Sequence, residues 1–187
     1  MPAFLDLLRK EHRDMAALLR ALEWQVAAFE AGDRPDYDVV RAALDYFQRF
    51  PDAHHHPREQ LLFARLRERD PKAADSVWDL GRAHAELSTR ADKFAAALRA
   101  ILEDEEIPRN AFAHLARGFI ELQRQHIDME ESAFFPAAER ALVATDWGDL
   151  TKMVALEADP LQDEKFDELR RTILRWQAQD QSVFAHH

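Results

Sequence analysis

Apolar residues recur every three or four positions along four long segments, which is the spacing of one face of an α-helix. The first segment carries this stripe without interruption, at Leu5, Leu8, His12, Met15, Leu19, Leu22, Val26 and Phe29. Comparable stripes run through residues 36–69, 75–103 and 110–143. The pattern therefore predicts four long helices.

Short breaks rich in proline, glycine and acidic residues separate these segments. They contain Gly32, Pro35, Asp70, Pro71 and Pro108. Glycine favours a helix C-terminal cap, and proline just beyond it prevents the helix from continuing. Pro51 and Pro136 instead lie inside the second and fourth stripes, where we expect the helix to bend or restart.

Four amphipathic helices with short connections predict an all-α, antiparallel up-and-down four-helix bundle. We assign residues 1–145 to this bundle. Residues 146–187 form a C-terminal helical extension that we expect to pack on it. The apolar positions that indicate the extra helix are Phe166, Leu169, Ile173 and Trp176.

Composition excludes several classes of protein. With 4 glycines in 187 residues, an all-β fold and a phosphate-binding glycine loop are both disfavoured. The absence of cysteine excludes disulfides and thiolate metal sites. A net charge of −10 opposes binding to nucleic acid or to anionic membranes. There is no apolar run of membrane-spanning length and no secretory signal pattern, so we expect a cytoplasmic protein.

Histidine is abundant, and its placement indicates chemistry. Of the nine histidines, one falls within each apolar stripe: His12, His55, His84 and His126. A single such residue would be an ordinary core histidine. Four imidazoles in one small core cost too much free energy unless they share a partner. A metal ion is such a partner, because neutral imidazole is among the commonest metal ligands.

Two of these histidines are followed four positions later by a glutamate, as His55 by Glu59 and His126 by Glu130. Residues four apart lie about 40° apart around a helix, so each pair shares one face. The two halves of the chain repeat this order, a lone histidine and then a HxxxE motif. Six nitrogen and oxygen ligands suit two metals bridged by the glutamates, and favour iron, manganese or zinc.

The order H…HxxxE…H…HxxxE resembles the hemerythrin-like (HHE cation-binding) domain over roughly residues 1–145. The resemblance implies His12, His55, Glu59, His84, His126 and Glu130 as ligands of two iron ions with an oxo or hydroxo bridge, for which zinc or manganese could substitute. Invertebrate oxygen carriers have a further histidine where this chain has Ser88, and their last carboxylate falls at the position of Glu131. Glu131 thus remains an alternative to Glu130.

The other histidines have simpler interpretations. His54 and His56 lie about 100° to either side of His55 on a helix, so we expect them to be solvated or to support the ligands. His114 is expected at the surface, and His186 and His187 belong to the tail. Beside a metal pair, four apolar residues would form a lining that excludes water: Phe63, Phe119, Leu122 and Phe134.

These features predict a non-haem di-iron protein that binds or senses a small oxidant, such as dioxygen, peroxide or nitric oxide. We favour binding over turnover, because no general acid is evident. One alternative is a di-iron peroxidase, oxidase or nitric-oxide reductase. Another is a structural or regulatory module stabilised by metal, with a protein partner or a second copy of the chain docked on it.

Overall fold

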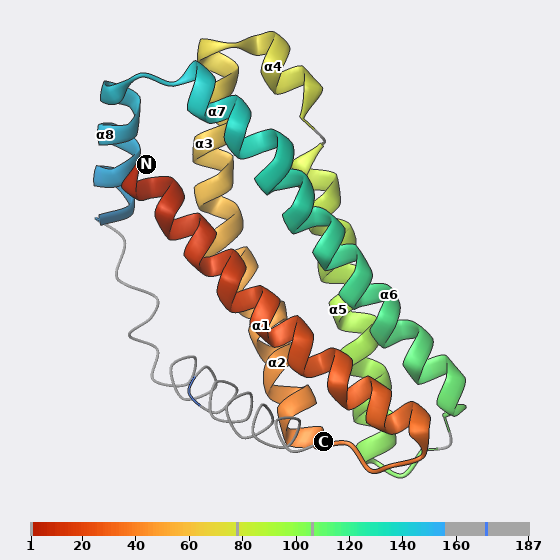
Figure 1. The fold of residues 1–187 in the computed structure, drawn as a ribbon. Coiled ribbons are helices and arrows are strands. Elements are labelled where there is room, and N and C mark those ends of the chain that lie inside the picture. Colours follow the sequence, from red (N-terminus) through yellow and green to blue (C-terminus); the bar gives the residue numbers. More distant parts are fainter. Residues whose placement is uncertain (1, 78, 106, 156–170, 172–187) are drawn as a thin grey trace, which may run out of the picture.

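The computed structural model describes residues 2–77, 79–105, 107–155 and 171, and every regular element among them is helical. Four antiparallel columns form the predicted bundle (Figure 1). They are α1 (Ala3–Ala31), α2 (Tyr37–Phe50) with α3 (His56–Arg69), α5 (Leu80–Leu102), and α6 (Arg109–Met129) with α7 (Phe135–Ala141). α1 packs against α2 and α6, and α5 packs against the same two helices. Each column therefore has two neighbours.

Aspartates and one glycine set the ends of these helices. Gly32 ends α1 in the left-handed conformation, with φ of 95°. The Asp36 carboxylate accepts hydrogen bonds from the first amides of α2. Asp79 does the same for α5, so the expected helix start near residue 75 was wrong by five residues. Between them, Asp70 caps the short helix α4 (Pro71–Ser76), which we did not predict.

Two of the columns contain a π-helical turn, at η1 (Pro51–His55) and η2 (Glu130–Phe134). In these turns the His56 amide donates to the Pro51 carbonyl, and the Phe135 amide donates to the Glu130 carbonyl. A proline follows two residues after each turn and supplies no amide hydrogen for the α-helical bond. The helices thus depart from regular α-helical geometry near Pro51 and Pro136, where we expected them to bend or restart.

The buried side chains form two hydrophobic clusters. One contains Met15, Leu19, Phe47, Phe94 and Phe119, from the half of the bundle where α1 ends. The other contains Leu5, Leu8, Leu62, Leu66 and Phe134, from the half where α1 begins. In sequence, the candidate ligands on every column fall between the members of these clusters. The fold therefore places a polar layer between two apolar ones.

The helix α8 (Ala144–Ala155) lies beside the start of α1 and also contacts α3 (Figure 1). Its Asp146 receives two hydrogen bonds from the Arg69 guanidinium of α3, both at 2.9 Å. The apolar positions at 166, 169, 173 and 176, and the histidines at 186 and 187, lie outside the described residues. No helix in the described part of the chain has the length and apolar character needed to cross a membrane.

Candidate metal centre

The four columns bring all six predicted ligands into one buried cluster. Each of these residues is at most 6% exposed: His12, His55, Glu59, His84, His126 and Glu130. His12 comes from α1, His55 from the π turn η1 and His84 from α5. The two lone histidines of the sequence pattern therefore face the two HxxxE motifs across the core.

Each glutamate lies between a histidine of one half of the chain and a histidine of the other. Glu59 Oε1 is 3.2 Å from His55 Nε2, and Glu59 Oε2 is 3.3 Å from His84 Nε2. Glu130 repeats the arrangement, with Oε2 3.2 Å from His12 Nε2 and Oε1 2.9 Å from His126 Nε2. Both carboxylates thus span the same two histidine pairs, as bridging ligands would.

The ligand atoms gather in two overlapping groups that could each hold a metal ion. One group is His12, His55, Glu59 and Glu130, and the other is His56, Glu59, His84 and His126. Within each group the ligand atoms lie within 4.8 Å of one another. Glu59 is common to both groups, and Glu130 also reaches His84 and His126.

Several polar atoms of this cluster are buried without a hydrogen bond of acceptable geometry among the described residues. They include both carboxylate oxygens of Glu59 and of Glu130, and the Nε2 atoms of His84 and His126. Burying two carboxylates side by side costs free energy unless cations compensate them. Divalent metal ions fit this donor set, which consists of imidazole nitrogen and carboxylate oxygen without sulfur.

Two further carboxylates bind the Nδ1 side of these histidines. Glu11 was not predicted from the sequence, and Glu131 was considered there as an alternative to Glu130. His55 Nδ1 lies 2.8 Å from Glu11 Oε2, and Glu11 also accepts from the buried Arg58 guanidinium. His12 Nδ1 lies 2.8 Å from Glu131 Oε1. A histidine that donates Nδ1–H to a carboxylate keeps the Nε2 lone pair free for a metal. Glu131 therefore lies behind His12, and Glu130 lies inside the cluster.

The model of one family, described as the hemerythrin HHE cation binding domain, matches residues 3–138. This match covers most of the chain. The chain belongs to the hemerythrin HHE family. No curated protein and no solved structure gave a significant match. Membership in this family means cation binding, and the buried histidines and glutamates of this HHE domain fit that activity.

His56 is not at the surface of the HHE domain. It is buried, and its ring stacks on that of His84 with centroids 3.6 Å apart. We placed it off the stripe because it is 100° from His55, but α2 and α3 together face two neighbouring columns. His55 points to α1, and His56 points to α5. His54 is half-buried, and His114 is exposed as predicted.

The carboxylates raise the pKa of two of the candidate ligand histidines. Burial alone lowers the pKa of His55, but Glu59 and Glu11 outweigh it and raise the pKa to about 10. Burial also opposes protonation of His84, and Glu130 and Glu59 raise its pKa to about 9. In the chain without bound metal, both rings are therefore protonated on both nitrogens and positively charged at neutral pH.

The reciprocal effect keeps the two central carboxyl groups ionised. Burial acts to raise the pKa of Glu130, but the imidazole nitrogens of His12 and His126 that lie close to its oxygens hold this pKa well below the usual range. Burial and Glu130 act to raise the pKa of Glu59, and the charge of His55 outweighs them so that this pKa is also lowered. The centre thus presents anionic oxygens, the form that binds metal ions.

The apolar lining of the centre differs in part from the expectation. Phe134 is fully buried, and Phe135, which we did not predict, stacks on the His12 ring with centroids 5.3 Å apart. Phe63 is half-buried and lies edge-on to Phe134. Phe119 packs instead in the hydrophobic cluster with Phe47 and Phe94. The apolar side chains beside the centre are therefore chiefly Phe134 at the end of η2 and Phe135 at the start of α7.

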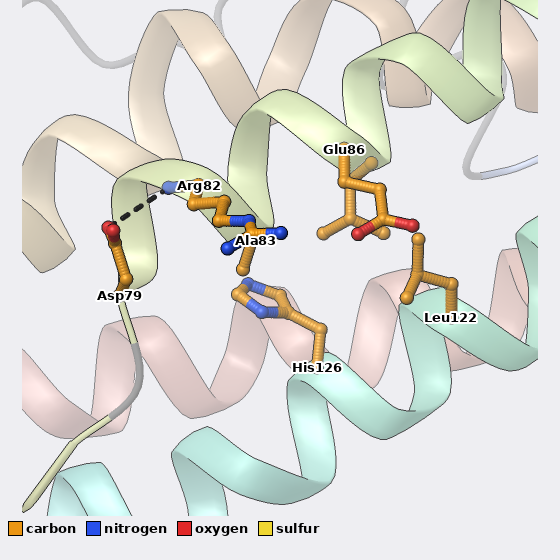
Figure 2. Close-up of a pocket in the computed structure, with 7 residues that line it drawn as sticks. Asp79, Arg82, Ala83, Glu86, Leu122 and His126 are labelled. Atoms are coloured by element: carbon orange, nitrogen blue, oxygen red, sulfur yellow. Dashed lines mark hydrogen bonds between the residues drawn. The ribbon is translucent and has the colours of Figure 1, made fainter.

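A pocket of about 360 Å³ connects the exterior with His126. Its lining residues are Asp79, Arg82, Ala83, Glu86, Leu87, Leu122 and His126. Figure 2 shows the His126 ring pointing from α6 toward Arg82 and Ala83 on α5. A small molecule in this pocket would contact His126, a candidate ligand, directly.

Proposed function

We propose that this HHE domain holds two iron ions and uses them to bind or sense a small oxidant. The observation that carries the proposal is the placement of Glu59 and Glu130, each with one oxygen facing each histidine pair. A carboxylate that spans two sets of nitrogen donors is suited to bridging two cations. The ligand set proposed is His12, His55, Glu59, His84, His126 and Glu130.

Iron is favoured over other cations by the setting of these donors in the core of a helical bundle. Histidine and carboxylate ligands that project into a helical bundle core are a known arrangement for two-iron centres. Zinc or manganese would accept the same donors. When bound, an iron pair supplies reversible electron transfer and positions at which a small oxidant can bind.

The pocket beside His126 supports the choice of a small ligand. Its position gives dioxygen, peroxide or nitric oxide a route to the ligand side chains. Leu87 and Leu122 provide an apolar lining, whereas Arg82, Glu86 and Asp79 provide charged groups. The apolar clusters on both sides of the polar layer restrict access from elsewhere. Binding without turnover stays our prediction, as does a cytoplasmic location.

An anaerobic purification tests the proposal. The protein is loaded with Fe²⁺, and iron is counted by elemental analysis before and after dioxygen, peroxide or nitric oxide is added. We expect about two iron ions per chain, as in other two-iron bundles, and a change in the optical spectrum with one of the three ligands. A folded protein that binds no iron and stays spectrally silent would refute the proposal.

The same samples separate the alternatives. Sustained consumption of peroxide or nitric oxide with an added reductant would identify an enzyme. For a structural module, His84→Ala would melt the protein. For a sensor, His84→Ala would abolish the spectral response and leave the helical circular dichroism unchanged.

A further inference from the structure

His56 is a buried histidine outside the ligand set proposed above. The residue is 5% exposed, whereas His54 is half-buried and His114 is exposed. The ring lies parallel to that of His84, with an interplanar angle of 6°. It also lies edge-on to the His126 ring, with centroids 6.2 Å apart. His56 is thus packed against the two other histidines of its group, His84 and His126.

A carboxylate fixes the orientation of this ring. His56 Nδ1 lies 2.8 Å from Asp52 Oδ1, and Asp52 Oδ2 accepts a hydrogen bond from Ser88 at 3.0 Å. With Nδ1–H donated to Asp52, Nε2 is the ring nitrogen that carries the lone pair. His12 and His55 show the same arrangement, since each also has Nδ1 beside a carboxylate. His56 therefore shares the support of the ligand histidines.

The ligand atoms of this region also converge. His56, Glu59, His84 and His126 each offer one ligand atom, and these atoms lie within 4.8 Å of one another. We propose that His56 is itself a metal ligand, which binds through Nε2 the ion held by His84 and His126. This inference rests on the proposed function, because it needs a metal at that position. The two ions then differ, one bound by two histidines and the other by three.

Nuclear magnetic resonance of the cadmium-loaded protein tests this directly. The full chain is labelled with ¹⁵N-histidine and loaded with ¹¹³Cd²⁺, and the one-bond couplings between cadmium and ring nitrogens are assigned. We expect one cadmium coupled to Nε2 of His56, His84 and His126. Coupling of His84 and His126 without His56 would overturn this inference and leave the metal pair intact. Cadmium that couples to no histidine would overturn the proposed function as well.

A pair of substitutions provides a second measurement. His56→Ala removes the proposed ligand, and His114→Ala removes an exposed histidine of the same bundle. In competition with a chelator for Co²⁺, we expect His56→Ala to weaken the binding of one of the two ions by at least about 10-fold. His114→Ala should leave both affinities unchanged. Equal affinities in the two variants would overturn the inference, and the cadmium spectrum of the unsubstituted chain does not depend on how either variant folds.

Discussion

Substitution of Glu11 by glutamine tests whether the carboxylates behind the histidines support metal binding. Glu11 is 6% exposed and joins His55 Nδ1 to the buried guanidinium of Arg58. Glutamine has nearly the same shape, but it removes the charge that both partners face. The change therefore isolates the electrostatic contribution of this one group.

Two effects of different size are expected. In the metal-free protein, Arg58 loses its buried counter-charge, which lowers the free energy of unfolding by about 3 kcal/mol. This is the lower end of the range for breaking a buried pair, because the amide oxygen can still accept one hydrogen bond. In addition, His55 becomes less well oriented and less basic, which weakens metal binding by about 10–100-fold. That loss corresponds to about 1.4–2.8 kcal/mol of binding free energy.

Glu23→Gln is the matched control on the same helix. Glu23 pairs with Arg124 at 2.7 Å, but the two side chains are 39% and 40% exposed. We expect Glu23→Gln to change the free energy of unfolding by less than about 1 kcal/mol. It should not change metal affinity, because Glu23 touches no candidate ligand among its hydrogen-bond partners.

Urea unfolding of the metal-free proteins and calorimetric titration with Fe²⁺ under nitrogen provide the two measurements. If Glu11→Gln and Glu23→Gln behave alike in both, the reasoning from burial and from support of His55 is wrong. A loss of stability with unchanged metal affinity would support the stabilising effect of the buried Glu11–Arg58 pair and refute the role of Glu11 in metal binding.

Three further predictions concern protons and backbone conformation. Because the pKa of His55 is about 10 and that of His84 about 9, metal binding at pH 7 should release roughly two protons. Calorimetry in two buffers of different ionisation enthalpy counts these protons. No release would contradict the assignment of His55 and His84 as ligands. The same raised pKa values stabilise the metal-free protein fully below pH 6.5, so its midpoint in urea should fall as the pH rises through about 9–10; the metal-loaded protein should not show this loss. Gly32→Ala should lower the free energy of unfolding by about 1 kcal/mol, since φ is 95° there. Gly148→Ala, inside α8 with open space around it, should raise the free energy of unfolding by about 0.5–1 kcal/mol. A change of the same sign in urea unfolding of both variants would refute the argument.

Periodicity predicted the columns of the bundle because a helix that buries one face has apolar residues every three or four positions. It also identified His55 with Glu59 and His126 with Glu130, since a spacing of four residues places both side chains on that face. The start of α5 could not be read in this way. Val77 fits the apolar stripe, but the Asp79 cap decides where the helix begins.

Glu11 was missed, and His56 was left open between a solvated and a supporting position, for one physical reason. Glu11 and His56 each follow or precede a ligand by one position, so each lies about 100° from the apolar stripe. A single amphipathic helix on a flat core would expose such positions. In this bundle every column has two neighbouring columns, and a residue turned by 100° faces the second neighbour rather than water. Single-sequence periodicity contains no information about that second contact.

The two HxxxE motifs have the same spacing, yet the backbone around them differs. The π turn η1 ends at the histidine of the first motif, whereas η2 begins at the glutamate of the second. A π turn adds a residue to the helical repeat, so it changes the direction of the side chains that follow it. In the first motif the π turn ends at His55, and Glu59 lies in the α-helix after it. In the second motif His126 lies in the α-helix, and the π turn begins at Glu130. A repeat in the sequence therefore does not produce two equivalent halves of the centre, and two ions bound there should occupy it in distinguishable steps.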